Sequence, residues 1–200
     1  TANHAALAEP YFRFRRRSLA NAMAYAKNNQ GRAGAFDADV ADRLGNNVGS
    51  HWSNETPGAQ IALLFWKHYL FTLDRGFLEE SAWPVMREVA RYYASLVVRG
   101  DDGVYRTLLS QAYEGSPLFE EVITDTAMIK ALMPAAADCA ALMGFSNEET
   151  AHWREIGEHM NGFDTVELDT DETEINDAGK PVFNHGLGKG CEVLTGRAFS

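Results

Sequence analysis

The sequence predicts an all-α protein whose helical hairpins form part of a toroid, with a short β-like excursion after residue 162. Apolar residues recur at helical spacing over most of the chain before that point. Some helices are separated by connections so short that they must lie antiparallel, whereas long loops separate one pair from the next. We therefore expect helical pairs packed side by side, with the long loops gathered at one end, where they build a site.

A first helix is expected from Pro10, which suits a first helical turn, to near Gly31. The stretch that follows, up to residue 59, is rich in Gly, Asn and Asp. Because it also contains Phe36, Leu44 and Trp52, it is predicted to be an ordered loop rather than a linker. Loops of this length inside a compact domain are usually functional or flexible.

The first hairpin is predicted from helices over 59–74 and 79–98, joined by the short segment Arg-Gly-Phe at 75–77. Pro84 falls early in the second helix, where a proline costs little. The aromatic residues of this hairpin fall at helical spacing and are predicted to be core residues: Trp66, Trp83, Tyr92 and Tyr93.

The second hairpin is predicted over 125–160, with Gly144 ending its first helix and Ser146 or Asn147 capping its second. Pro134 lies in mid-helix and should kink it. Between the hairpins, the segment 101–110 combines Asp-Gly turn chemistry with a short β-prone run.

A single carboxylate, Glu114, lies in a short loop between a tyrosine and a glycine. Partial desolvation beside an aromatic ring raises the pKa of a carboxyl group, which keeps a proton available near neutral pH. Glu114 is therefore a candidate general acid. The alternative is a carboxylate that accepts backbone N–H bonds and caps its own loop.

The loop over 49–56 supplies side chains suited to a sugar, which has one apolar face and a rim of hydroxyl groups. The candidate substrate-binding residues are His51, Trp52, Asn54, Glu55 and, from the Glu114 loop, Tyr113. The alternative is a packed loop tryptophan, with Asn54 or Glu55 capping the next helix.

Neither a metal nor a cofactor is expected. His152 and His159 share a helix face but lack a completing ligand set, and the acidic run at 169–174 lacks the glycine and terminal glutamate of a calcium loop. The cysteines, Cys139 and Cys191, form neither a metal framework nor a disulfide scaffold.

The charge and hydropathy of the chain exclude two classes of partner. The net charge is −10 and the basic run at 13–17 is short, so nucleic acid is not expected. No apolar stretch is long enough to cross a bilayer, so membrane insertion is not expected.

The segment 57–97 resembles a hairpin of glycoside hydrolase family 95 and related six-hairpin glycosidases. Members of that family have a Pro-Gly-Gly-Ala segment, a His-x-x-Tyr-x-x-Thr helix, an Asp-x-x-Phe-Leu turn and a Tyr-Pro-x-Met helix. This sequence has Pro57-Gly58-Ala59, His68 to Thr72 with Tyr69 in place, Asp74 to Leu78, and Trp83 to Met86.

The next landmark of the family is a Ser-x-Ser-Pro-Glu-Asn loop followed by a helix that opens on an aspartate. Here Ser-Gln-Ala-Tyr-Glu-Gly-Ser at 110–116 occupies that place, and the helix from 125 follows it. The departures are Ala112 and Tyr113 for Ser-Pro, and Gly115 for Asn. The resemblance, which covers residues 3 to 160, implies that Glu114 is the general acid.

The resemblance further implies an (α/α)6 barrel that hydrolyses α-L-fucosyl or α-L-galactosyl linkages of an oligosaccharide or glycan with inversion, and a periplasmic or secreted location. The water-activating groups of the family, an Asn-rich motif and a distant Asp, lie outside the matched region. We therefore expect residues 1–200 to be a partial (α/α)6 catalytic domain, truncated at both ends, whose base comes from outside this segment.

Two rival classes of function stay open. One is another six-hairpin enzyme, either a phosphorylase or a polysaccharide lyase, for which Tyr113 and His51 could supply the Tyr/His pair that a lyase needs. The other is a non-catalytic helical scaffold or binding module, which predicts no concave polar pocket around Glu114.

Overall fold

The computed structural model describes residues 5–38, 40–48, 54–112, 116–163, 165–167 and 181–183. The helical elements are the 3-10 helix η1 (Ala5–Ala8), α1 (Glu9–Gln30), α2 (Thr56–Thr72), α3 (Arg75–Phe77), the π-helix η2 (Leu78–Ala82), α4 (Trp83–Leu96), α5 (Ile123–Leu142) and α6 (Glu148–His159). The strands form three antiparallel pairs: β1 (Val98–Arg99) with β2 (Tyr105–Arg106), β3 (Ser110–Gln111) with β4 (Leu118–Phe119), and β5 (Thr165–Glu167) with β6 (Pro181–Phe183). The predicted all-α class is confirmed, with the β-like excursion at β5 and β6.

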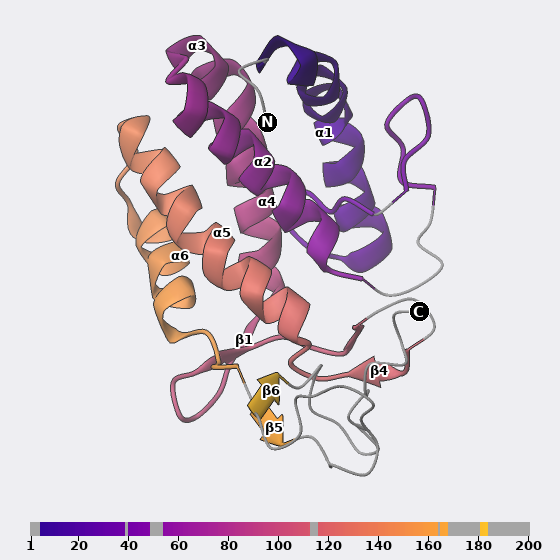
Figure 1. Ribbon diagram of the computed structural model, residues 1–200, viewed down its shortest axis with the longest axis vertical. Helices are drawn as coiled ribbons and strands as arrows, with labels where there is room; N and C mark the ends of the chain where they lie inside the picture. The colour runs from indigo at the N-terminus through magenta and orange to yellow at the C-terminus, as the bar shows by residue number, and fades with distance from the viewer. Residues whose placement is uncertain are drawn as a thin grey trace.

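Both predicted hairpins are present and lie side by side. The helix α4 packs back along α2, and α6 packs back along α5, while α5 also packs against α2 and α4. As a result α2 and α5 start at the same end of the molecule, the lower right in Figure 1. The loops that precede these two helices are thereby brought to one end, as the sequence predicted.

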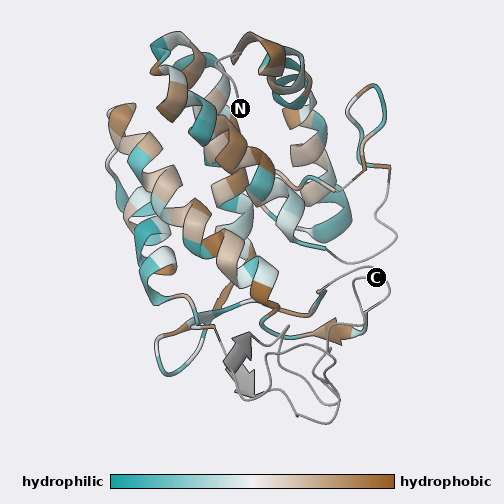
Figure 2. Ribbon diagram, viewed as in Figure 1, coloured by the Kyte–Doolittle hydropathy of each residue, from teal (hydrophilic) through white to brown (hydrophobic). Residues whose placement is uncertain are grey.

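The position of each helix in the hairpins follows from its polarity. Most of α5 is apolar, whereas α6 is largely hydrophilic on its outer side (Figure 2). A helix that is apolar around most of its circumference must be covered by other elements. The largest fully buried side chains come from α2, η2, α4, α5 and α6: Trp153, Tyr92, Tyr93, Phe65, Leu78, Met86, Ile129, Leu132, Met133, Ile156, Val85 and Val89.

The short connection in the first hairpin differs from the prediction. Arg75 to Phe77 were expected to join the helices, but they form the first turn of the second one. The Asp74 carboxylate caps this turn by accepting from the Phe77 backbone N–H at 3.1 Å. The reversal is confined to Leu73, which adopts a left-handed φ of 53°, and Asp74. The capping aspartate explains the shift, because an N-cap satisfies backbone donors that the connector would have left free.

A π-helical turn, η2, precedes Pro84 in this helix. The Trp83 backbone N–H donates to the Leu78 carbonyl, five residues earlier. Because proline has no N–H, the Glu80 carbonyl lacks its usual partner from Pro84. It accepts instead from Arg16 Nε at 2.9 Å, which ties α1 to the irregular turn.

The loop after α1 is ordered over its described residues, but only part of the prediction about its anchors holds. Phe36 is buried and stacks on Tyr25, whereas Leu44 is exposed at 64% and is held only through its backbone, whose carbonyl oxygen accepts from Asn21 Nδ2 at 3.3 Å. Trp52 lies outside the described residues. The loop is held instead by backbone contacts, including Ala35 N–H to the Glu88 carbonyl at 2.9 Å.

Two of the three predicted helix boundaries in the second hairpin are confirmed, and the start of its first helix differs from the prediction. Asn147 is the N-cap of α6 and forms a capping box with Thr150, and α5 ends just before Gly144, whose φ is 79°. However, α5 begins at Ile123, so that Asp125 lies inside its first turn. The helix continues through Pro134, and Gly157 of α6 lies against the proline ring.

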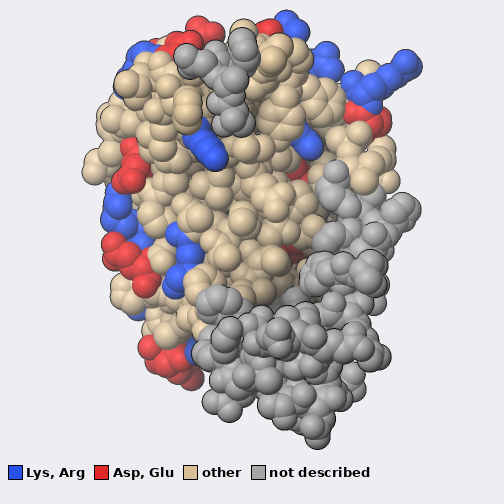
Figure 3. Space-filling model, viewed as in Figure 1, with Lys and Arg blue, Asp and Glu red and all other residues tan. Residues whose placement is uncertain are grey.

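The face toward the viewer in Figure 3 carries few charges over α2 and α5, with acidic and basic side chains at its margins. Three apolar residues of α2 are exposed: Leu64, Leu70 and Phe71, at 46%, 53% and 74%. Even so, none of the helices that the structure describes combines the length and apolarity needed to cross a membrane.

The loop after α1 approaches the backbone of α4 closely at Gly34, where a side chain would not fit. A Cβ at Gly34 would lie 2.2 Å from the Glu88 carbonyl oxygen and 2.3 Å from the Tyr92 nitrogen, and its φ is +81°. We expect Gly34→Ala to lower the free energy of unfolding by about 3 kcal/mol or more, combining left-handed strain with overpacking. Chemical denaturation of the full chain measures this loss.

The matched control is Gly31→Ala. Gly31 also has a positive φ, of 66°, but a Cβ there meets nothing within 4 Å. It should lose only the left-handed strain of about 1 kcal/mol. Equal losses for the two variants would show that the close approach to α4 has no energetic weight.

Candidate active site

The N-terminus of α2 is fixed by Tyr93, which reaches it from α4. The Tyr93 hydroxyl donates to the Glu55 carbonyl oxygen and accepts from the Ala59 backbone N–H at 3.0 Å. Its side chain is buried, with 1% exposed. Buried backbone groups at a helix start need such partners, so this one hydroxyl settles where α2 begins relative to α4.

Glu55, just before α2, turns its carboxylate toward the neighbouring tyrosine. Glu55 Oε2 accepts from the Tyr92 hydroxyl at 2.7 Å. Burial raises the pKa of the Glu55 carboxyl, an effect opposed by the Tyr92 hydrogen bond and the charge of Arg32. Glu55 is therefore a half-buried acid that holds its proton more tightly than a solvated glutamate does.

Asn54 forms a turn before α2. Its Oδ1 accepts from the Thr56 backbone N–H at 3.0 Å and from the Thr56 hydroxyl. Of the two residues expected as possible caps for this helix, Asn54 thus supplies a side-chain acceptor for a backbone donor, whereas Glu55 does not cap.

A second buried carboxyl, Asp125, lies in the first turn of α5. Asp125 is fully buried, and its Oδ2 accepts from the Ser110 hydroxyl. Among the described residues, its Oδ1 has no hydrogen-bond partner. Burial raises the pKa of Asp125 to about 7; the charge of Glu55 adds to this rise, and the Ser110 hydrogen bond opposes it. The packing of α2 against α5 brings the starts of the two helices, and with them these two carboxyl groups, to the same end of the molecule.

The Glu114 segment is bracketed by the hairpin of β3 and β4. Ser110 pairs with Phe119 and Gln111 with Leu118. Beyond the strands, the Ala112 backbone N–H donates to the Ser116 hydroxyl oxygen at 3.1 Å. The described residues on either side of Glu114 are therefore tied to each other.

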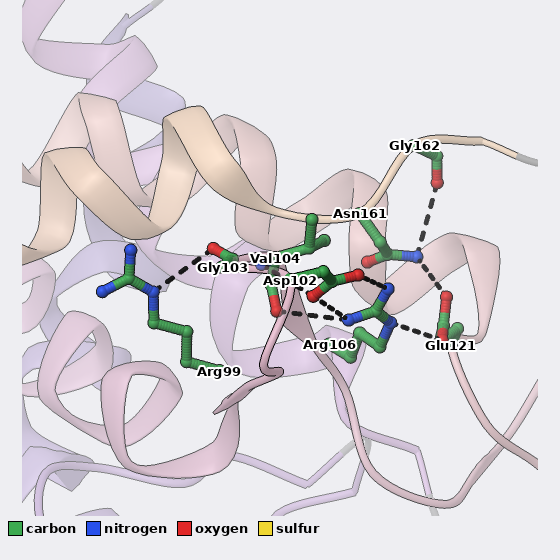
Figure 4. A network of polar contacts seen from close by, with 8 residues as sticks. All are labelled: Arg99, Asp102, Gly103, Val104, Arg106, Glu121, Asn161 and Gly162. Carbon is green, nitrogen blue, oxygen red and sulfur yellow. Dashed lines mark hydrogen bonds and ion pairs between the residues drawn. The ribbon is translucent and has the colours of Figure 1, made fainter.

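A polar network fastens the chain on both sides of this hairpin (Figure 4). Arg106 of β2 contacts Asp102 at 2.6 Å and Glu121 at 3.1 Å. Glu121 in turn accepts from Asn161 Nδ2, beyond α6, at 2.9 Å. Because Glu121 lies between β4 and α5, the network joins the turn of β1 and β2 to the start of α5 and to the end of α6.

The predicted site residues are placed only in part. His51, Trp52, Tyr113 and Glu114 lie outside the described residues, so their positions stay predictions. Asn54 and Glu55 lie at the start of α2. The described flanks of the 49–56 and 110–117 segments do reach the same end of the helices, as Figure 1 shows.

Sequence reasoning missed the residues that build this end of the molecule. Tyr92 and Tyr93 were correctly predicted as core, but their hydroxyl groups also bind Glu55. Asp125 was recognised only as a helix opener. The signal that could have found it is an acid two residues after an apolar pair, Val122 and Ile123, in the first turn of an apolar helix.

The other candidates for chemistry have structural contacts. His152 lies against Glu155 at 3.3 Å, and His159 contacts the Glu155 carbonyl oxygen at 3.0 Å. Over the part of the chain that the structure describes, there is no group of His, Cys, Asp and Glu suited to a metal ion. Cys139 is a buried thiol. Cys191 and the acidic run at 169–174 lie outside the described residues.

Comparison with known proteins gives a family for this architecture. The model of the glycosyl hydrolase family 95 catalytic domain matches residues 1–170. Kojibiose hydrolases from Flavobacterium johnsoniae and Mucilaginibacter mallensis are 28% and 33% identical over 86 and 84 residues, which is 42% of this chain and 12% of each relative. Alpha-L-fucosidase 2 from Arabidopsis thaliana is 24% identical over 156 residues, 70% of this chain and 18% of that protein. The chain therefore spans less than a fifth of the length of these relatives.

A solved structure, of a putative kojibiose phosphorylase from the human microbiome, aligns with a TM-score of 0.63 at 15% identity. The alignment covers 91% of this chain and 27% of that structure. At this identity the likeness shows the fold alone, which confirms that the helical hairpins are part of a six-hairpin toroid.

The buried carboxyl of Asp125 predicts a pH dependence of stability. Its pKa of about 7 in the folded state is above the ordinary aspartate value of 3.8, so between these two pH values the folded state holds a proton that the unfolded state has lost. Its contribution to stability is complete below pH 4 and is lost as the pH rises through 7. Asp37, whose pKa burial raises to about 6, acts in the same direction.

We expect Asp125→Asn to flatten the decline in the free energy of unfolding between pH 4 and pH 8, because the amide never becomes charged. Denaturant titrations of the full chain across this range provide the measurement. Asp138→Asn, an exposed change on the same helix, is the control and should leave the wild-type slope unchanged. A wild-type slope in Asp125→Asn would contradict the assignment.

Proposed function

This chain belongs to the glycosyl hydrolase family 95 catalytic domain, and from that membership we propose that it is part of an enzyme that hydrolyses a glycosidic bond, with Glu114 as the general acid. The structural observation that carries the proposal is the convergence at one end of the helices. The flanks of both candidate segments lie there, beside two acids, Glu55 and Asp125, whose pKa values are raised by burial. Acids with perturbed pKa values cluster at functional sites.

In the proposed reaction, Glu114 donates its proton to the oxygen of the leaving group as the bond between the anomeric carbon and that oxygen breaks. A water molecule attacks the opposite face of the sugar and loses a proton to a base supplied from outside this segment. This is inverting hydrolysis, in which the acid and the base are about 6.5–9.5 Å apart.

Candidate groups for holding the sugar are His51, Trp52, Asn54, Glu55 and Tyr113. The contacts of two of them refine their roles. The side-chain oxygen of Asn54, Oδ1, accepts a hydrogen bond from the Thr56 backbone N–H, and Glu55 Oε2 accepts one from the Tyr92 hydroxyl. Any contact of Asn54 with a sugar hydroxyl would therefore come from its amide nitrogen, and any contact of Glu55 would come mainly from Oε1.

The proposed substrate is a terminal α-L-fucosyl or α-L-galactosyl linkage. The Arabidopsis relative, named alpha-L-fucosidase 2, supports this choice over the longest matched segment, 156 residues. A second candidate is a kojibiose-type α-glucoside, which is favoured by the two relatives named kojibiose hydrolase and by their higher identity.

A substrate panel separates these candidates. The full-length enzyme, of which this segment is a part, is incubated with an aryl α-L-fucoside, an aryl α-L-galactoside and kojibiose, with and without inorganic phosphate. Release of free sugar without phosphate supports hydrolysis, whereas a phosphate requirement with sugar phosphate as product indicates a phosphorylase. An unsaturated product absorbing in the ultraviolet indicates a lyase.

We expect Glu114→Gln to keep the fold and sugar binding but to lower kcat on a natural glycoside by about 10²–10⁴-fold, the usual effect of removing a positioned acid. An activated aryl glycoside should lose much less rate, because its leaving group needs little protonation. The measurement is kcat on both substrates, with the melting temperature as a control for folding. Unchanged kcat on the natural glycoside, or a lower melting temperature alone, would show that Glu114 caps its loop.

A further inference from the structure

The contact between Ser110 and Asp125 joins two parts of the candidate site. Ser110 belongs to β3, the strand that leads into the Glu114 segment, whereas Asp125 belongs to the first turn of α5. Both residues are buried, with 1% and 0% exposed. The Ser110 hydroxyl donates to Asp125 Oδ2, so one hydrogen bond connects the hairpin to the helix.

The β3–β4 hairpin links this hydrogen bond to the residues that flank Glu114. The pairing of Ser110 with Phe119 fixes one strand on the other. The bond from the Ala112 N–H to the Ser116 hydroxyl then draws together the two residues that flank positions 113–115. Glu114 is in the middle of those three positions in the sequence. The described residues on either side of Glu114 are thus connected, through β3 and β4, to the helix that carries Asp125.

The Ser110–Asp125 contact has a high free-energy cost for a contact that only holds the fold together. A buried carboxyl group with an unpaired Oδ1 among the described residues loses hydration that one serine hydroxyl does not replace. An apolar pair of similar size would hold the strand on the helix at lower cost. Polar groups kept at such a cost, in a region that also contains a candidate acid, indicate a role in orienting that acid.

We propose that Ser110 and Asp125 form a positioning pair for the general acid, holding the β3–β4 hairpin at the height on α5 from which Glu114 reaches the leaving-group oxygen. The inference rests on the proposed function, since it assigns Glu114 that role. Neither Ser110 nor Asp125 is a catalytic residue. Both are buried, and each acts through the backbone of the hairpin.

The test is a double-variant experiment in the full-length enzyme, which also contains the proposed base. Ser110→Ala removes the donor, and Asp125→Asn keeps an acceptor but removes the charge. Each is made alone and together with Glu114→Gln, and kcat and KM are measured on a natural glycoside and on an activated aryl glycoside. Ser95→Ala is the matched control, because the Ser95 hydroxyl donates to the Tyr92 carbonyl within α4 and leaves the hairpin untouched.

We expect Ser110→Ala to lower kcat on the natural glycoside by about 10–100-fold, since small displacements of a positioned group have effects of this size. KM should change little, and the aryl glycoside should lose less than about 3-fold, because its departure needs little proton donation. Asp125→Asn should show the same pattern with a smaller loss. In the Glu114→Gln background, where no acid remains to be positioned, neither change should lower kcat further.

Each contrary outcome points to a different failure. Equal losses on both substrates, or losses that add in full to that of Glu114→Gln, would show that the pair only stabilises the fold. The positioning role alone fails if Glu114→Gln behaves as expected but Ser110→Ala and Asp125→Asn leave the ratio of the two rates unchanged. An unaltered kcat in Glu114→Gln itself would overturn the proposed function and this inference together.

Discussion

The structure depends on one constraint: two largely apolar helices, α2 and α5, begin at the same end, and the backbone N–H groups of their first turns need partners there. Water does not reach much of this end, because the first residues of α2, Thr56 to Ala59, and Asp125 and Thr126 of α5 are buried. The partners therefore come from side chains, above all the Tyr93 hydroxyl at Ala59 and the Asn54 oxygen at Thr56. Polar groups are thus concentrated where two buried helices start, and this concentration gives the end of the molecule its capacity for chemistry.

Hydrophobic periodicity predicted the helices of both hairpins because their burial is decided by local spacing. The same reasoning misplaced the turn at 75–77, since the choice between connector and helix depended on a single cap, Asp74. It also counted Leu44 among the apolar residues that indicate an ordered loop, whereas the Leu44 side chain is exposed and the loop is held there by hydrogen bonds to the backbone, which side-chain hydropathy does not reveal. Composition and periodicity indicate which side chains a segment buries, but not which backbone groups it forms hydrogen bonds with.

For the candidate site, the sequence alone indicated which loops would converge but not what would hold them. Glu55 could be named from its neighbours, whereas its bond with Tyr92 joins residues that are far apart in the chain. Likewise, nothing local marks Ser110 as the partner of Asp125. The first pair arises where α4 packs on α2, and the second where β3 meets the first turn of α5, so both become visible only in the assembled fold.

The π-helical turn at Leu78–Ala82 is equivalent to a single residue inserted into a regular helix. Each residue of an α-helix advances the side chains by about 100° around the axis. The extra residue therefore sets the rotation of everything that follows it in α4. Without it, Tyr92 and Tyr93 would point in other directions along the circumference of the helix, and the start of α2 would lose both hydroxyl groups. The π-helical turn at one end of the hairpin thus determines the direction of the two tyrosine side chains at the other end. Arg16 binds the Glu80 carbonyl oxygen within this turn, so α1 also contributes to the orientation of α4.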